Sequence, residues 1–207
     1  MEGMIAAWYA KNTGKSIAEF RDLAKRIADG LSSGDRVLEV APGPGYLAIE
    51  LARLGYQIAG LDVSRTFVRI ARENAARAGV QVDFQEGDAS GLPFVAAAFD
   101  FIICRAALKN FSDPVGALRE MHRVLRSGGK AIIIDMRSDA SSKSIVDEVA
   151  KMHLSRIDAL LTRTTLSALR RRAFSRLDFE RMAEATPFGR CDIVDLPLGF
   201  EVTLVKS

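Results

Sequence analysis

A carboxylate and closely spaced glycines meet in the segment 39–45 (E-V-A-P-G-P-G), directly after a short apolar run. Gly43 and Gly45 would let the backbone turn sharply and approach a ligand at a distance that a Cβ atom would prevent. The start of a following helix would add free amide hydrogens and a positive partial charge. Asp62 closes a second apolar run and could accept hydrogen bonds from both hydroxyls of a ribose. The spacing predicts a nucleotide cofactor, and NAD stays open because residues 43–48 also satisfy the G-x-G-x-x-G/A pattern.

Alternating strand-like and helix-like segments would position these groups. Short β-type runs cover residues 37–40, 57–63, 81–85, 99–104 and 130–135, and helical spacing covers 45–55, 64–78 and 113–125. This rhythm predicts a doubly wound parallel α/β sheet with helices on both faces, whose ligands bind at the carboxyl ends of the strands.

The last third of the chain departs from this rhythm. Helices are expected over 144–161 and 175–185, and Ser175 with Asp178 as its N3 partner would open the second of them. Two β-type runs, 191–196 and 200–205, flank the turn L-P-L-G and close the chain.

The composition excludes several classes of protein. The chain has 207 residues, 48% of them hydrophobic and 27% charged, so one globular domain over 1–207 is expected rather than disorder. Cys104 and Cys191 lack the spacing of metal ligands, so no metal site is predicted, and a reducing compartment fits them best. We find neither an apolar run of the ~18 residues that a membrane span needs nor a signal peptide, and we expect a cytoplasmic protein without a membrane partner.

Five segments in a fixed order resemble the motifs of one enzyme family. They are the glycine segment 39–45, G-L-D-V-S at 60–64, G-D-A at 87–89, the approach to the fourth strand over 93–101, and L-R-E-M-H-R-V-L-R-S-G-G at 118–129. Together they are similar to class I S-adenosylmethionine-dependent methyltransferases, in the methyltransferase type 11 branch that includes ubiquinone/menaquinone C-methyltransferases. The resemblance runs from Asp35 to Arg137, with a looser match over 191–205. Ala41 departs from it, because the family has glycine at this position.

The resemblance implies a Rossmann-like sheet of seven mostly parallel strands, an antiparallel last hairpin and a helical insertion before that hairpin. It divides the chain into N-terminal cap helices (1–34), a cofactor-binding core (35–137), a helical substrate lid (138–188) and a closing hairpin (189–207). The cofactor would be S-adenosyl-L-methionine, converted to S-adenosyl-L-homocysteine by in-line methyl transfer to an unidentified small molecule. The residues implied to bind the cofactor are Tyr9, Glu39, Ala41, Pro42, Gly43, Gly45, Asp62, Val63, Gly87, Asp88, Ala89 and Arg105.

No unmistakable general base is present, and the catalytic residues stay unknown. Lys109 and Asp135 follow predicted strands and His153 lies on a predicted amphipathic helix, so each is a weak candidate. The sequence leaves open two alternatives to a methyltransferase, namely a nicotinamide-dependent oxidoreductase and a non-catalytic protein that binds S-adenosylmethionine.

Basic residues outnumber acidic ones between Arg137 and Arg190, and they include the run Arg170-Arg171-Arg172. They form either a solvated helix face or part of a lid that favours an anionic acceptor. Nucleic acid is an unlikely partner, because stacking aromatic residues are not interleaved with the arginines. A monomer or a homodimer is expected.

Overall fold

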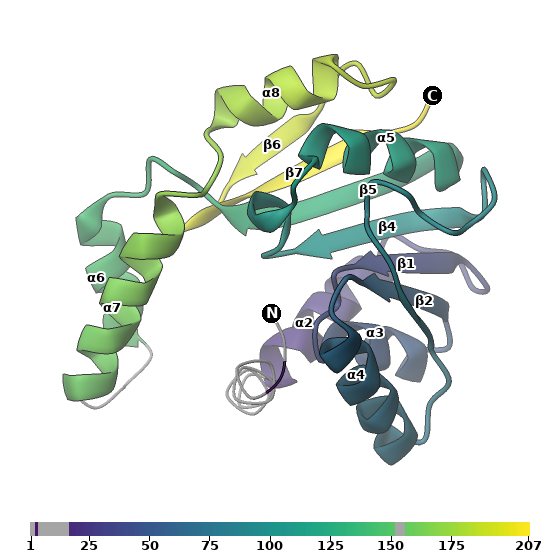
Figure 1. Cartoon of the computed structure of the whole chain (residues 1–207), viewed down its shortest axis with the longest axis horizontal. Coiled ribbons are helices and arrows are strands. Elements are labelled where there is room, and N and C mark those ends of the chain that lie inside the picture. Colours follow the sequence, from purple (N-terminus) through teal and green to yellow (C-terminus); the bar gives the residue numbers. More distant parts are fainter. Residues whose placement is uncertain (1–2, 4–16, 152–155) are drawn as a thin grey trace.

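The central element of the structure, a computed structural model, is a seven-stranded sheet in the order β3-β2-β1-β4-β5-β7-β6 (Figure 1). The structure describes Gly3 and residues 17–151 and 156–207. All neighbouring strands are parallel except β7, which runs antiparallel to both β5 and β6. The predicted doubly wound sheet with an antiparallel last hairpin is therefore confirmed. The strands are β1 (Arg36–Val40), β2 (Gln57–Asp62), β3 (Asp83–Glu86), β4 (Phe99–Arg105), β5 (Leu125–Met136), β6 (Asp192–Asp195) and β7 (Gly199–Val205).

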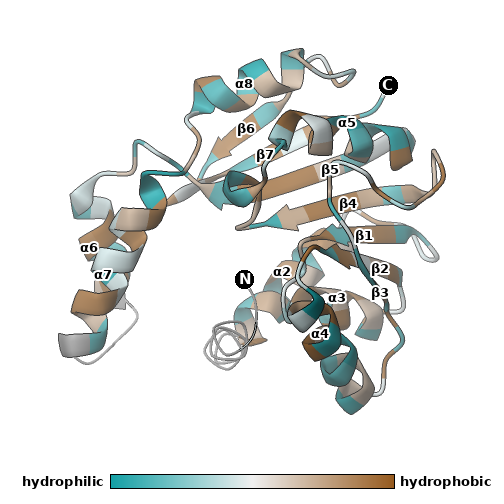
Figure 2. Cartoon of the chain, viewed as in Figure 1, coloured by the Kyte–Doolittle hydropathy of each residue, from teal (hydrophilic) through white to brown (hydrophobic). Residues whose placement is uncertain are grey.

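Helices cover both faces of the sheet. On one face, α2 (Ile17–Ala28), α3 (Tyr46–Arg53) and α4 (Arg65–Ala78) share a hydrophobic core with the strands. On the other face, α5 (Pro114–Val124) and α8 (Arg176–Glu184) contribute to a second core. The central strands between these layers are largely hydrophobic (Figure 2). Successive residues of β4, Ile102 and Ile103, are both fully buried, as expected for a strand covered on both sides.

Several helices begin and end at residues that the sequence predicts. Ser64 accepts a hydrogen bond from the amide of Phe67 at the start of α4, and Gly79 ends that helix in a left-handed conformation. Ser175 and Asp178 form a complete capping box at the start of α8.

The insertion between β5 and α8 contains a helical hairpin, α6 (Ser142–Lys151) and α7 (Arg156–Arg170). The two helices pack against each other and extend away from the sheet (Figure 1). The single helix predicted over 144–161 is therefore wrong. Ile145 and Val149 are buried, whereas Leu160 and Leu161 are about 60% exposed, so the apolar spacing does not follow one continuous buried face.

The other boundaries differ by a few residues. Strand β3 begins at Asp83 rather than at residue 81. Strand β5 begins at Leu125 and includes the predicted turn 127–129, because Gly128 and Gly129 exchange backbone hydrogen bonds with Lys206 beyond the end of β7. Among the described helices, none is long and apolar enough to span a membrane.

Candidate functional site

The strand order places a crevice between β1 and β4. The chain leaves β1 toward β2 on one side and leaves β4 toward β5 on the other, and doubly wound sheets bind ligands at such a switch point. A pocket of about 210 Å³ lies at the carboxyl ends of these strands. It is lined by Val40, Ala41, Leu61, Val63, Gly87, Asp88, Ala89, Asn110, Phe111 and Ser112. Five residues predicted from three separate segments therefore share one pocket: Ala41, Val63, Gly87, Asp88 and Ala89.

The two glycines of the 39–45 segment have different structural roles, although both have positive φ values. A Cβ on Gly45, where φ is +79°, would lie 2.6 Å from Cζ of Phe84, so this glycine permits close packing inside the fold. A Cβ on Gly43, where φ is +54°, would meet no atom within 4 Å. Gly43 therefore leaves open space beside the crevice, which is the space that a bound ligand could use.

Ala41 adopts a conformation that normally requires glycine. Its φ is +57°, in the left-handed region that costs a residue with a Cβ about 1–2 kcal/mol. A 2.8 Å hydrogen bond from its amide to the carbonyl oxygen of Leu61 holds the backbone in place. The left-handed backbone conformation at this position therefore explains why the resemblance expects a glycine there.

Glu39 is a buried carboxyl group with an unused acceptor atom. It is 4% exposed, and among the described residues its Oε2 has no hydrogen-bond partner. Burial raises its pKa from 4.5 to about 8, against the lowering effects of a hydrogen bond from the Ala48 amide and of the nearby Arg105 charge. A cation brought next to Oε2 would stabilise the ionised carboxylate, so the geometry fits a ligand with a positively charged group.

Asp62 is held rigidly at the end of β2. Its Oδ2 accepts a hydrogen bond from the Gly43 amide at 2.9 Å, and its Oδ1 accepts one from the Ser64 amide at 2.8 Å. These bonds tie the carboxylate to the glycine segment and to the residue that caps α4.

Asp88 lies at the rim of the first pocket. Hydrogen bonds from the hydroxyl and the amide of Ser90 lower its pKa, so the group stays ionised at neutral pH.

Arg105, the last residue of β4, connects the crevice to α2. Its guanidinium group lies 4.8 Å from the centre of the Phe20 ring and 4.0 Å from Oε2 of Glu19. Helix α2 therefore packs beside the carboxyl end of β4. The predicted cofactor residue Tyr9 lies outside the described residues.

A second pocket, of about 430 Å³, lies at the carboxyl ends of β4 and β5. Most of its lining is apolar and comes from β5, α7 and the turn before β7, with charged groups from β4, η2 (Leu108–Asn110), β5 and α6. The lining residues are Arg105, Ala106, Lys109, Ile134, Asp135, Met136, Glu148, Leu166, Leu169, Leu196, Pro197, Leu198 and Gly199.

The structure brings two of the three candidate bases together as a buried ion pair. Nζ of Lys109 lies 2.6 Å from Oδ1 of Asp135, and the two side chains are only 5% and 1% exposed. Each of the two side chains is therefore the other's partner in an ion pair, and a catalytic role for either residue stays a prediction. His153 lies outside the described residues.

The run Arg170-Arg171-Arg172 does not line the second pocket, where the cations are Arg105 and Lys109 instead. Arg170 donates a 2.7 Å hydrogen bond to the carbonyl oxygen of Ala140, and the next two arginines are exposed. Sequence reasoning also missed Phe111 and Ser112 in the first pocket and the L-P-L-G turn in the second. That turn could have been found, because a strand antiparallel to β5 must begin beside the carboxyl end of β5.

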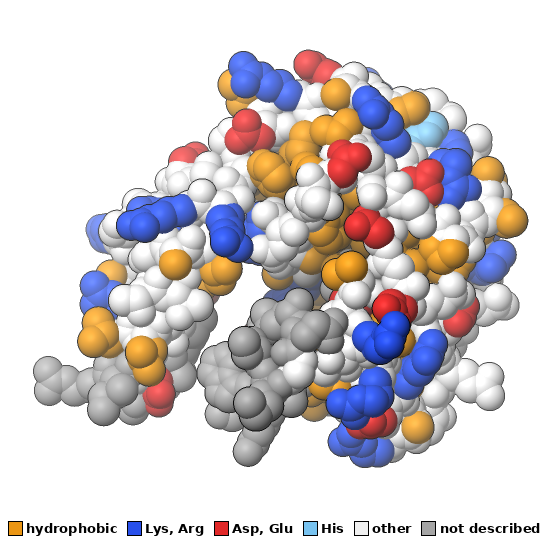
Figure 3. All heavy atoms as spheres, in the orientation of Figure 1, with side chains coloured by type: hydrophobic (Ala, Val, Ile, Leu, Met, Phe, Trp, Pro, Cys, Tyr) orange, Lys and Arg blue, Asp and Glu red, His pale blue; other side chains and the backbone are white. Residues whose placement is uncertain are grey.

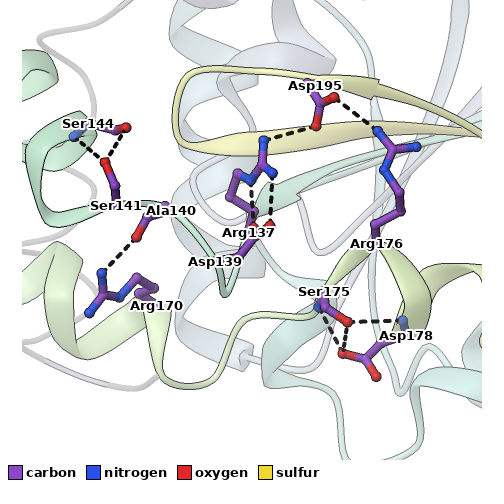
Figure 4. Close-up of polar contacts among 10 residues, drawn as sticks. All are labelled: Arg137, Asp139, Ala140, Ser141, Ser144, Arg170, Ser175, Arg176, Asp178 and Asp195. Atoms are coloured by element: carbon purple, nitrogen blue, oxygen red, sulfur yellow. Dashed lines mark hydrogen bonds and ion pairs between the residues drawn. The ribbon is translucent and has the colours of Figure 1, made fainter.

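A polar network fixes the base of the helical hairpin (Figure 4). Asp195 of β6 bridges Arg137 and Arg176 at 2.9 and 3.0 Å, and both guanidinium groups lie over the ring of Phe200. The amide of Ser138 donates to the carbonyl oxygen of Phe174 at 3.1 Å, which joins the two ends of the insertion. The α6–α7 hairpin is thus attached to the sheet through a short double-stranded neck.

The amino-acid sequence is similar to a known protein family and to several curated proteins. The family described as "Methyltransferase domain" matches residues 38–133, which lie within the segment that carries the sequence resemblance. The uncharacterized methyltransferase YcgJ of Bacillus subtilis is 34% identical over 145 residues, which cover 69% of this chain and 56% of YcgJ. The demethylmenaquinone methyltransferase of Deinococcus radiodurans is 39% identical over 108 residues, or 51% of this chain and 45% of that protein. The chain thus spans about half the length of these curated relatives.

A solved structure of similar size supports the fold. The SAM-dependent methyltransferase of Aquifex aeolicus superposes with a TM-score of 0.66 at 16% identity, covering 91% of this chain and 97% of that one. At this level of identity the likeness shows the fold, and the assignment to a family depends on the sequence matches.

Proposed function

Because the chain belongs to the class I S-adenosylmethionine-dependent methyltransferase family, in the branch of the ubiquinone/menaquinone C-methyltransferases, we propose that it transfers the methyl group of S-adenosylmethionine to a small molecule. The cofactor supplies an activated methyl group. The protein has to hold that cofactor, align an acceptor in line behind the methyl group and exclude water.

Glu39 is the observation that carries the proposal. Its buried carboxyl group lies in β1, and among the described residues its Oε2 has no hydrogen-bond partner, so a cationic ligand group would find a partner there. The ammonium group of the methionine part of S-adenosylmethionine is such a group. Nicotinamide cofactors offer no comparable aliphatic ammonium, and a nicotinamide-dependent oxidoreductase is not favoured.

The other crevice residues fit the remaining parts of the cofactor. Gly43 leaves room for close approach, and Asp62 would accept hydrogen bonds from the ribose hydroxyls. Asp88 would accept a bond from the adenine amino group, and the Ala89 amide would donate to a ring nitrogen, in the pocket that both residues line. Tyr9 stays a predicted cofactor residue.

The second pocket is the proposed acceptor site. It lies beside the cofactor crevice, with Arg105 at the boundary, and α7 contributes Leu166 and Leu169 to its wall. We therefore assign the lid role to the α6–α7 hairpin and not to α8, which packs against α5 and β7. Lys and Arg side chains occur on the face of the hairpin seen in Figure 3, but the described arginines of α7 do not line the second pocket. The cytoplasmic location and the monomeric or dimeric state stay predictions.

Calorimetric titration with S-adenosylmethionine, S-adenosylhomocysteine and NAD tests the cofactor assignment. We expect both sulfur compounds to bind and Asp62→Asn to weaken them by about tenfold to hundredfold, because it replaces charge-assisted hydrogen bonds. The matched control is Asp83→Asn at the exposed start of β3, which should not change the affinity. Binding of NAD but of neither sulfur compound would refute the proposal.

Transfer of a labelled methyl group to a panel of acceptors tests the activity itself. With any acceptor that is turned over, Leu169→Ala should raise its KM and leave the affinity for S-adenosylmethionine unchanged, because Leu169 lines only the second pocket. Leu160→Ala on the exposed side of α7 is the control. Cofactor binding without turnover of any acceptor would instead favour a non-catalytic binding protein.

A further inference from the structure

We propose that Glu120 and Arg123 of α5 are positioning residues for the cofactor, which hold the turn 88–91 where Asp88 and Ala89 can form hydrogen bonds with the adenine ring. The inference rests on the proposed binding of S-adenosylmethionine and adds the origin of its selectivity for adenine. Both side chains lie outside the lining of the two pockets, so they would act through the turn.

The first support is the irregular backbone of the segment 87–98, which joins β3 to β4 and contains neither helix nor strand. Its position therefore depends on bonds to neighbouring elements. At its start, the amide of Gly87 donates to the carbonyl oxygen of Asp62 in β2 at 3.1 Å. Within the turn, the amide of Gly91 donates to the carbonyl oxygen of Asp88 at 3.1 Å. These bonds fix the start and the shape of the turn, so its location also depends on an attachment beyond residue 91.

The second support is a set of hydrogen bonds that α5 makes directly after the turn. The guanidinium group of Arg123 donates to the carbonyl oxygens of Leu92 at 2.9 Å and of Phe94 at 2.8 Å. Oε2 of Glu120 accepts a bond from the amide of Leu92 at 2.9 Å. The carbonyl oxygen of Arg123 accepts a bond from the amide of Ala97 at 3.0 Å. Four backbone groups of the segment therefore bond to two residues of one helix.

The third support is that the two α5 side chains hold each other in place. Nε of Arg123 donates to Oε1 of Glu120 and Nη2 donates to Oε2, both at 2.7 Å, which is the bidentate geometry of a strong ion pair. The hydrogen bonds from Arg123 lower the pKa of Glu120, so the carboxylate stays ionised at neutral pH. The planar guanidinium group thus bonds to the carboxylate and to the segment at the same time, which a lysine could not do.

The fourth support is the location of this pair at the edge of the core. The side chains of Glu120 and Arg123 are 20% and 38% exposed, so water can replace their hydrogen bonds and the fold should survive their removal. Leu92, in contrast, is buried in the same hydrophobic cluster as Ala89 of the first pocket. A displacement of the backbone at Leu92 would therefore reach the residues that line the pocket.

The test compares two ligands that differ at the purine ring, S-adenosylhomocysteine and S-inosylhomocysteine, in which a carbonyl oxygen replaces the amino group. In calorimetry, the unmodified protein should bind the adenine compound at least about tenfold more tightly, because the inosine compound offers no donor to Asp88. The double variant Glu120→Gln/Arg123→Met removes both charges together and should reduce this preference to about threefold or less. Arg123→Lys keeps the charge without the planar group and should also reduce the preference. The matched control Arg69→Met/Glu73→Gln removes an ion pair of α4 and should retain it.

Hydrogen–deuterium exchange of the ligand-free protein tests the attachment without a cofactor. The amides of residues 88–92 should exchange at least about tenfold faster in the double variant, while those of β1 and β4 should exchange as in the unmodified protein. Unchanged exchange would overturn the proposal, and so would faster exchange with the preference for the adenine compound fully retained.

The two measurements also separate this proposal from the proposed function. Equal binding of both ligands by the unmodified protein would overturn the role of the turn in adenine selectivity. If neither ligand binds the unmodified protein, the proposed function is refuted, and the exchange rates alone decide whether Glu120 and Arg123 hold the turn. Circular dichroism checks the fold of the double variant, and if that variant is unfolded, Arg123→Lys replaces it in both measurements.

Discussion

Replacing Glu39 by glutamine should have opposite effects on stability and on cofactor binding. The buried carboxyl group has a pKa of about 8 in the folded chain, against an ordinary value of 4.5. Between these values the unfolded chain releases a proton that the folded chain retains. The contribution of Glu39 to stability is therefore complete below pH 4.5, decreases as the pH rises and is lost above pH 8.

The size of the effect follows from that interval. Each pH unit between the two pKa values, 4.5 and about 8, corresponds to about 1.4 kcal/mol. The unmodified protein therefore loses at most on the order of 5 kcal/mol of its free energy of unfolding between low and high pH. Glutamine does not ionise and is close in shape to a protonated glutamic acid. Glu39→Gln should therefore match the unmodified protein near pH 5 and become progressively more stable than it toward pH 9.

Urea denaturation of the cofactor-free protein at a series of pH values measures this difference directly. Glu86→Gln, at a partly exposed carboxylate on the end of β3, is the control and should change stability by less than about 0.5 kcal/mol at every pH. Stability curves of Glu39→Gln and the unmodified protein that stay parallel from pH 5 to pH 9 would refute the reasoning about burial.

Cofactor binding should respond in the opposite direction. A cation bound beside Oε2 stabilises the carboxylate, so S-adenosylmethionine should bind the unmodified protein more tightly as the pH rises toward 8 and should release protons on binding. Glu39→Gln should bind about tenfold to hundredfold more weakly at pH 8.5 and without this pH dependence. Calorimetry in buffers of different ionisation enthalpy measures the proton release. Equal affinities of the two proteins would remove Glu39 from the cofactor site.

Four further substitutions separate cofactor contacts from effects on backbone conformation and packing. Gly45→Ala should destabilise the fold by about 3 kcal/mol or more, because its Cβ would meet Phe84 at 2.6 Å in a left-handed conformation. Gly43→Ala should cost only about 1 kcal/mol of stability but weaken S-adenosylmethionine at least about tenfold, and normal binding by a folded Gly43→Ala would show that the glycine serves only the turn. Ala41→Gly should raise the free energy of unfolding by about 0.5–1 kcal/mol by relieving its positive φ, whereas a lower urea midpoint would contradict this. Ser175→Ala should lower stability by about 1 kcal/mol through loss of the capping box, as read from the urea midpoint.

Features determined by neighbouring residues could be predicted from the sequence. The cap of α4 at Ser64 and the capping box at Ser175 follow from short-range hydrogen bonds, and the sequence shows both. The residues of the first pocket were predictable because parallel strands end at the same edge of the sheet, so segments far apart along the chain meet there.

Features that depend on distant partners were not predictable in the same way. Lys109 and Asp135 could each be placed after a strand, but their pairing depends on the β4–β5 register and on the position of η2. The early start of β5 depends on backbone hydrogen bonds that Gly128 and Gly129 share with Lys206, just beyond the end of the neighbouring strand β7. The division of the predicted 144–161 helix into two is a tertiary feature that apolar spacing alone did not reveal.

The double-stranded neck has a consequence for how recognition of the acceptor can change. Since the amide of Ser138 donates to the carbonyl oxygen of Phe174 and Arg137 forms a parallel β-bridge with Phe174, the two ends of the segment 139–173 are held together beside the sheet. Doubling the length of a flexible connection costs only about 0.6 kcal/mol, so this segment can be shortened, extended or exchanged at little expense to the core. Arg137 and Arg176 hold the attachment point through Asp195, whatever hairpin is carried beyond it. The fold thus has an interchangeable part at its proposed acceptor site, and we expect hairpins grafted from relatives between residues 138 and 174 to change which acceptors are used.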